Sequence, residues 1–129
     1  MSVTLQIGGS LLPPSSVALS GTSETDVYAP TAGPQVVLSI AVCNQDTSNA
    51  CRVTIRWSDG TNTYHLFTAN IEAGETEGVT HGLPLVLNPQ ATNGDGPTKK
   101  ITAQAAAGGD LTITTIATRT VAQNSLPGR

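Results

Sequence analysis

Hydrophobic and polar residues alternate along most of this chain, most regularly in the segment 51–67. Its sequence, CRVTIRWSDGTNTYHLF, has an apolar residue at every second position before a turn at 60–61 and then alternates again. Such alternation is typical of a strand with one buried and one solvated face. If 60–61 is a two-residue turn with glycine first, as a type II′ turn prefers, Trp57 lies opposite Tyr64. The segment is therefore predicted to be a β-hairpin.

The same register places the rings of Trp57 and Tyr64 on the apolar face of this hairpin. It pairs Ile55 with Leu66, and both of these residues lie on the same face as the two rings. Large aromatic side chains in phase with aliphatic residues usually pack in the core. We therefore expect both rings in the core, rather than on an exposed platform for stacking sugars.

Alternation at other points of the chain predicts further short strands, at 3–7, 17–19, 26–28, 36–44, 79–87, 101–105 and 111–116. The spacing from Ile113 to Ile116 breaks the period of two, so we expect a bulge near Thr114 or Thr115, or an outward-facing Ile116. No segment has the periodicity of an amphipathic helix. Eight or so short strands predict an all-β antiparallel sandwich, immunoglobulin-like or jelly-roll, and the sequence leaves that choice open.

The segment 36–44 is the best candidate for a core strand outside the hairpin. One face is predicted to consist of larger aliphatic residues: Val36, Leu38, Ile40 and Val42. The other face is small and nearly apolar: Val37, Ser39, Ala41 and Cys43. A strand of this kind is central in its sheet, or a neighbour covers its outer face.

Two cysteines, Cys43 and Cys51, bracket a polar loop. If their strands form an antiparallel hairpin in which Val42 pairs with Val53, Cys43 lies opposite Arg52. Directly paired residues share a face, so this register sends the two sulfurs to opposite sides of the sheet. In the reducing compartment expected below, we predict two thiols rather than a disulfide, with Cys51 in the core. Another strand order would reopen the question.

The chain has 129 residues and a mass of 13.2 kDa, which suits a single domain. We expect an N-terminal strand and extended arm at 1–15, a sandwich at 16–122 and a C-terminal tail at 123–129. Pro13 and Pro14 favour an arm or a sheet edge, because proline cannot donate to a ladder.

Charge is sparse: 12% of the residues are charged and the formal net charge is -3. Lys99 and Lys100 form the only adjacent basic pair, too little positive charge for a phosphate backbone, so we expect no direct nucleic-acid binding. The N-terminus lacks the cationic and apolar segments of a secretory signal, and no apolar run approaches the length of a membrane helix. We expect a soluble protein, made in a cytoplasm, that does not bind membranes.

The two histidines, His65 and His81, are the first candidates for a general base or a metal ligand. His65 falls opposite Arg56 in the predicted hairpin, an unfavourable place for a cation. Neither histidine has Cys, His or carboxylate partners at ligand spacing, so we expect surface imidazoles. Phe67 shares the solvated phase with His65, and an exposed Phe there would be a contact residue.

Acidic residues and glycines also fail to form a recognisable site. The segment Asn93–Gly96 (NGDG) faintly resembles a calcium loop, but it lacks the alternating ligands and the final Glu of an EF-hand. Glu72, Glu75 and Glu77 surround a tight turn and offer no placed partner for glycoside hydrolysis. A nucleophile elbow, a phosphate-binding glycine loop and a nucleotide fingerprint are absent from the sequence. We expect no enzymatic activity, no cofactor and no metal.

The stretch from about residue 36 to residue 120 resembles the small β-sandwich virion proteins of tailed bacteriophages. The resembling segments are VTIRWSDGTNTYHLF, IEAGETEG, LPLVLNP and KKITAQAAAGGDLTITTIATRT. Such proteins combine a Trp-bearing strand, a short hairpin, a Gly-containing turn and an Ala-rich late strand. The resemblance implies a structural, non-enzymatic role without a cofactor, in a virion assembled in the cytoplasm of a bacterial host.

From this resemblance we expect a capsid decoration or cement protein that binds at lattice junctions, with the major capsid protein or other virion proteins as partners and with self-association into a homo-oligomer. The alternatives are a neck, tail-terminator or tail-associated component, and a carbohydrate- or receptor-binding module. An enzyme would require a cleft joining a histidine to a carboxylate. The expected contact residues are Leu11, Leu12, Tyr28, Phe67, Asn93, Gly94, Asp95 and Gly96.

Overall fold

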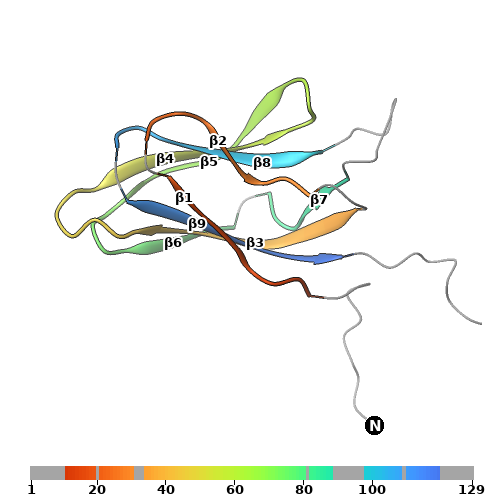
Figure 1. The fold of residues 1–129 in the computed structure, drawn as a ribbon, viewed down its shortest axis with the longest axis horizontal. Coiled ribbons are helices and arrows are strands. Elements are labelled where there is room, and N and C mark those ends of the chain that lie inside the picture. Colours follow the sequence, from red (N-terminus) through yellow and green to blue (C-terminus); the bar gives the residue numbers. More distant parts are fainter. Residues whose placement is uncertain are drawn as a thin grey trace, which may run out of the picture.

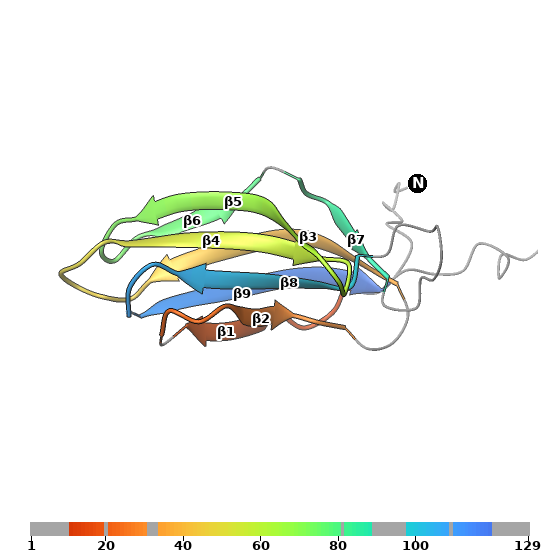
Figure 2. The same ribbon diagram turned by 90° about the horizontal axis from the view of Figure 1, so that it is seen from above.

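The computed structural model describes residues 11–19, 21–30, 34–80, 82–88, 98–108 and 110–119. These residues form nine strands in two antiparallel sheets packed face to face (Figures 1 and 2). The five-stranded sheet contains β1 (Ser15–Leu19), β3 (Gln35–Asn44), β6 (Thr76–Val79), β7 (Leu85–Leu87) and β9 (Leu111–Arg119). The four-stranded sheet contains β2 (Thr25–Tyr28), β4 (Cys51–Ser58), β5 (Thr63–Ile71) and β8 (Lys100–Ala105). Within these ranges there is no helix that could span a membrane.

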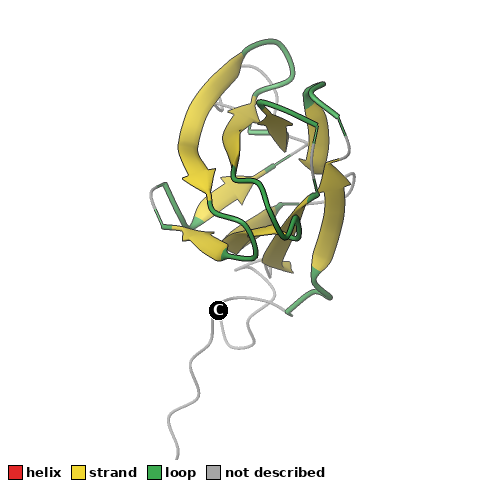
Figure 3. Cartoon of the chain, turned by 90° about the vertical axis from the view of Figure 1, so that its left-hand side faces the viewer, coloured by secondary structure: helices red, strands yellow, loops and turns green. Residues whose placement is uncertain are grey.

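The strand order identifies the topology as a jelly roll. The sheets have the orders β1-β9-β3-β6, with β7 also paired to β3, and β2-β8-β4-β5. β1 pairs with β9, β2 with β8 and β3 with β7 and β6, and the innermost pair is the β4-β5 hairpin. This nested order of pairing is typical of a jelly roll, which consists of two Greek keys. In an immunoglobulin fold the first two strands share a sheet, whereas here β1 and β2 lie in opposite sheets. The predicted all-β antiparallel sandwich is confirmed, and Figure 3 shows its two layers end-on.

The tip of the β4-β5 hairpin follows the predicted register. Trp57 pairs with Tyr64 and Arg56 with His65. Gly60 has a φ of 99°, a conformation that glycine adopts without a steric cost. The amide of Asp59 donates to the carbonyl of Asn62 at 3.2 Å, which closes the turn. Local turn chemistry therefore determines this end of the hairpin.

A bulge changes the register farther from the tip. Ile55 pairs with Phe67 and not with Leu66, because the pairing shifts by one residue between Ile55 and Arg56. Phe67 consequently belongs to the inward phase and packs against the core. Leu66 lies beside Gly82, where an added Cβ would come within 2.4 Å of its Cδ1. The predicted pairing of Ile55 with Leu66 and the predicted solvated position of Phe67 are both wrong for this reason.

A second bulge lies in β3 and exchanges its two faces at one end. The pairing with β9 shifts between Val37 and Ser39, so Val37 points into the core and Val36 points outward. The predicted grouping of Val36 with Ile40 is therefore wrong. In β9, every second residue from Leu111 to Ala117 points into the core without interruption. Ile116 pairs with Ser39 and faces outward, which confirms the second of the two predicted alternatives.

The core lies between the sheets and consists mainly of β-branched and other aliphatic side chains. Its largest fully buried members are Ile40, Ile55, Ile71, Leu87, Ile101, Leu111, Ile113, Val27, Val37, Val42 and Val53. Asn44 is also buried, and its Nδ2 donates to the carbonyls of Asn49 and Ile71, both at 2.9 Å. Because these bonds satisfy its amide, Asn44 fastens the loop after β3 to the end of β5 without leaving an unpaired donor.

The two cysteines are free and lie in different sheets, Cys43 on β3 and Cys51 on β4. The predicted hairpin of these strands, with Val42 opposite Val53, is wrong because β3 pairs with β9, β6 and β7. Cys51 is buried as expected, and Cys43 is half-buried in the outward phase of β3.

Two isoleucines of β9 allow a matched test of this arrangement. Ile113 is fully buried, whereas Ile116 faces outward and is half-buried. We expect Ile113→Ala to lower the free energy of unfolding by about 2–5 kcal/mol, because it leaves a cavity in the core. Ile116→Ala should cost about 1 kcal/mol or less, the span of β-propensity effects. Urea-induced unfolding checks both values, and equal losses would contradict the assigned faces.

Candidate functional site

The expected contact residues at the start of the chain lie along the edge of the five-stranded sheet. Leu11 forms an isolated bridge with Thr118 and is 68% exposed. Leu12 donates its amide to the carbonyl of Ala117 at 2.9 Å and packs against the core. This segment therefore continues the β1 edge toward residue 10, with one leucine anchored and one presented to solvent. The expected contact loop at Asn93–Gly96 lies outside the described residues.

Tyr28 and Phe67, also expected to be contacts, have structural roles. The Tyr28 hydroxyl donates to Oε1 of Gln35, a bond that joins β2 of one sheet to β3 of the other. Burial raises the pKa of this hydroxyl above its ordinary value, and the nearby Arg119 charge acts in the opposite direction. Phe67 packs against the core because of the β5 bulge. Of the described candidates, Leu11 is the one that offers a large exposed apolar side chain.

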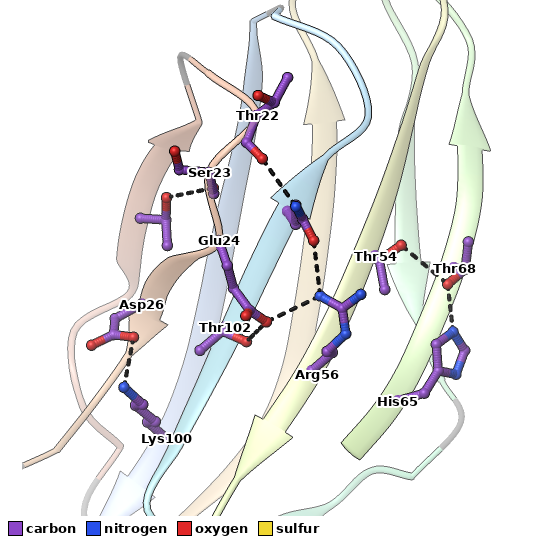
Figure 4. A network of polar contacts seen from close by, with 12 residues as sticks. Thr22, Ser23, Glu24, Asp26, Thr54, Arg56, His65, Thr68, Lys100 and Thr102 are labelled. Carbon is purple, nitrogen blue, oxygen red and sulfur yellow. Dashed lines mark hydrogen bonds and ion pairs between the residues drawn. The ribbon is translucent and has the colours of Figure 1, made fainter. Parts of the chain in front are cut away.

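The outer face of the four-stranded sheet carries a network of polar side chains centred on Glu24 (Figure 4). Its Oε2 accepts bonds from Nη1 of Arg56 at 3.0 Å and from Oγ1 of Thr102 at 2.8 Å. Arg56 Nη1 also donates to Oε1 of Gln104 at 3.1 Å, and Gln104 Nε2 donates to the carbonyl of Thr22 at 3.1 Å. The network ties the turn before β2 onto β8 and β4, so these groups stabilise the fold.

Other polar groups on this face are similarly engaged. Lys100 Nζ lies 3.0 Å from Oδ1 of Asp26. His65 is exposed, as predicted, and its Nε2 shares a hydrogen bond with Oγ1 of Thr68, which in turn donates to Oγ1 of Thr54 at 3.4 Å (Figure 4). None of these contacts joins a histidine to a carboxylate. Sequence reasoning did not single out Glu24, because its partners lie 32 and 78 residues farther along the chain.

A hollow of about 310 Å³ lies at the end of the sandwich where β3 leads into β4. Asp46 contributes to its lining, and its Oδ1 accepts the amides of Ser48 at 2.8 Å and Asn49 at 3.0 Å. These bonds hold the pKa of Asp46 below its ordinary value. Cys51 Sγ, also in the lining, lies 3.7 Å from the carbonyl of Ala107. The Asp46 carboxylate is thus occupied by the amides of its own turn.

Among the described residues no three His, Cys, Asp or Glu side chains are grouped to hold a metal.

At the opposite end, the hairpin tip presents an aromatic pair. The rings of Trp57 and Tyr64 stack with centroids 4.4 Å apart and an interplanar angle of 27°. Tyr64 is 41% exposed and Trp57 is half-buried, so the expectation that both rings lie in the core is wrong. Both side chains are in phase with the inward-facing residues of their strands, but they lie at the end of the sheet, where the core no longer covers them. Hydrophobic alternation does not distinguish the end of a strand from its middle. The Tyr64 hydroxyl donates to Oδ2 of Asp59 at 3.3 Å.

Comparisons with known proteins add little to this description. No model of a known protein family matches the chain, and no curated protein does. One similar solved structure is a chain from Bacillus endospore appendages, described as a novel family of disulfide-linked pili. It is 11% identical with a TM-score of 0.47, and the match covers 93% of this chain and 97% of that chain. A similarity this distant supports no functional argument.

The hairpin tip yields a test by pH. The amides of Asn62 and Thr61 donate to Oδ1 of Asp59 at 2.7 and 2.8 Å and hold its pKa below the ordinary 3.8. Because the folded-state pKa is the lower one, its contribution to stability is complete above about pH 4 and is lost as the pH falls through the folded value. Asp59→Asn keeps an acceptor but removes the titration. We expect a shallower acid-side decline in its free energy of unfolding, and identical declines in the two proteins would contradict the assignment.

Proposed function

We propose that this chain is a structural virion protein that decorates the capsid of a tailed bacteriophage and stabilises it by binding at lattice junctions. The observation that carries the proposal is the exposed Leu11 at the sheet edge, beside the anchored Leu12. Support also comes from the resemblance of 36–120 to small phage virion proteins. Jelly rolls occur in capsid proteins, lectins and cupins alike, so the fold is compatible with the role without selecting it.

The proposed mechanism is adhesion by the N-terminal arm. Val3, Leu5 and Ile7 alternate with polar residues and precede Leu11, so the arm has the sequence of a strand that can add to the edge of a partner's sheet. Each contact is weak, but symmetry repeats it across the lattice. A neck or tail-terminator component would use the same adhesion, and ring formation would distinguish it from attachment across the capsid surface.

Deleting residues 1–10 tests this mechanism. The deletion must stop before Leu11, because Leu11 and Leu12 pair with β9 and Leu12 packs against the core. We expect loss of binding to capsids that lack this protein, measured by co-sedimentation, with an unchanged urea midpoint. Leu11→Ser should weaken binding about tenfold or more, since burying a leucine is worth about 1.5–3 kcal/mol.

Two matched variants serve as controls for this experiment. Leu11→Met should retain binding because its apolar volume is similar, and deletion of residues 123–129 should also retain it. Full binding by the 1–10 deletion would refute the proposed mechanism.

A carbohydrate-binding module is a second candidate, favoured by the partly exposed Tyr64 ring stacked on Trp57. Trp57 is the only tryptophan in the chain, so tryptophan emission, excited at a wavelength where tyrosine does not absorb, reports on this pair. If the pair binds glycans, oligosaccharides should shift the emission of the wild type and of Tyr28→Phe but not of Tyr64→Ala. A panel of glycans that leaves all three spectra unchanged would remove this candidate.

A further inference from the structure

The outward positions of the five-stranded sheet hold no charged side chain, in contrast to the outer face of the four-stranded sheet. We define the uncharged face as the outward positions of β1, β9, β3, β6 and β7, together with Leu11. Its apolar side chains include Leu11, Val36, Ala41, Cys43, Ile116 and Val86, of which Leu11 is 68% and Val86 54% exposed. The remaining outward positions hold serine, threonine, alanine or glycine.

The opposite outer face provides the internal comparison. It carries the Arg56–Glu24 and Lys100–Asp26 ion pairs as well as His65 (Figure 4). In an antiparallel sandwich both outer faces normally alternate to polar residues and meet water. Depletion of charge together with exposed aliphatic side chains is instead typical of the central part of a protein interface. The two outer faces of the domain therefore differ in composition, and the uncharged one has the composition of a protein interface.

We propose that the uncharged face binds the same face of a second copy, so that two sandwiches stack sheet against sheet about a two-fold axis. A two-fold axis brings the same patch of both copies together, and groups close to the axis lie near their own copies. A charged face would then oppose like charges, in a chain whose net charge is already -3, whereas this face opposes none. Ala41 of β3 and Gly78 of β6 are paired on it, and small side chains allow sheets to approach to about 10 Å.

The size of the face sets the expected strength. With strands about 4.8 Å apart and about 3.3 Å per residue, four strand positions and seven residues cover roughly 450 Å² in projection. Specific interfaces of standard size bury about 800 Å² on each partner, so this one lies at the small end. Interfaces this small are typical of weak, transient complexes, so we expect a concentration-dependent association with a dissociation constant on the order of micromolar to hundreds of micromolar.

Cys43 supplies a reporter that belongs to this face. It lies in the outward phase of β3 and is half-buried in the single chain, whereas Cys51 is 6% exposed and belongs to the core. A maleimide therefore labels Cys43 in the monomer, and stacking of a second copy covers it. The rate of labelling should fall several-fold as the protein concentration rises through the dissociation constant.

Sedimentation equilibrium over about 1–500 μM, the range expected for a small interface, tests the association. We expect the mean mass of the wild type to rise from one chain to two. Ala41→Glu and Thr114→Glu each place a carboxylate on the face and should remain monomeric. Asn70→Glu adds the same charge on the exposed opposite face, across from Arg52, and should dimerise like the wild type. Thermal melts check that each variant is folded. If one of the two face variants does not fold, the other still tests the proposal.

The other outcomes overturn the proposal. A wild type that stays monomeric, an Ala41→Glu variant that dimerises normally, or a closed ring in place of a dimer each contradicts it. If residues 1–10 cover the face instead, their deletion accelerates Cys43 labelling at every concentration, and the proposal also fails. Leu11 belongs to this face and also to the proposed capsid-binding site, but the two failures are distinguishable: the 1–10 deletion keeps Leu11, so it should abolish capsid binding and leave the dimer intact.

Discussion

The structure depends on burial of the inward faces of two sheets whose strands pair across long stretches of sequence. Apart from the β4-β5 hairpin, each paired strand meets a partner that is not its neighbour in the chain, as β1 meets β9 and β2 meets β8. Bringing such distant strands together costs loop-closure entropy before the stabilising contacts between them form. The fully buried aliphatic layer, with Ile40, Ile55 and Ile113 among its members, supplies the compensating free energy.

The polar chemistry of the described residues serves this architecture. Glu24, Arg56 and Thr102 fasten the turn before β2 to the four-stranded sheet, and Asp46 and Asp59 accept amides within their own turns. A carboxylate held by backbone amides in its ionised form is a poor general base, because its pKa lies far from the working pH. The two outer faces therefore differ in charge: one carries the Arg56–Glu24 and Lys100–Asp26 ion pairs, and the outward positions of the other hold no charged side chain.

Two β-bulges determine which residues those surfaces contain. The bulge in β5 turns Phe67 inward, and the bulge in β3 exchanges Val36 and Val37. Each inserts one extra residue into a ladder whose side chains alternate with a period of two, so every residue beyond it changes face. Without the first bulge Phe67 would be an exposed contact, and without the second Val36 would leave the uncharged face. Which residues form an outer surface of this sandwich thus depends on single-residue shifts of register.

The amino-acid sequence by itself determined the all-β class, the hairpin with Trp57 opposite Tyr64, and the burial of Cys51, because these follow from local alternation and turn chemistry. It left the choice between a jelly roll and an immunoglobulin-like fold open, and it placed β3 beside β4, where the structure has β8. It also did not indicate that Glu24 meets Arg56 or that one outer face is free of charge. Those features required the tertiary structure, since strand order, bulge position and the pairing of distant residues are set by competition among long-range contacts, which no local pattern encodes.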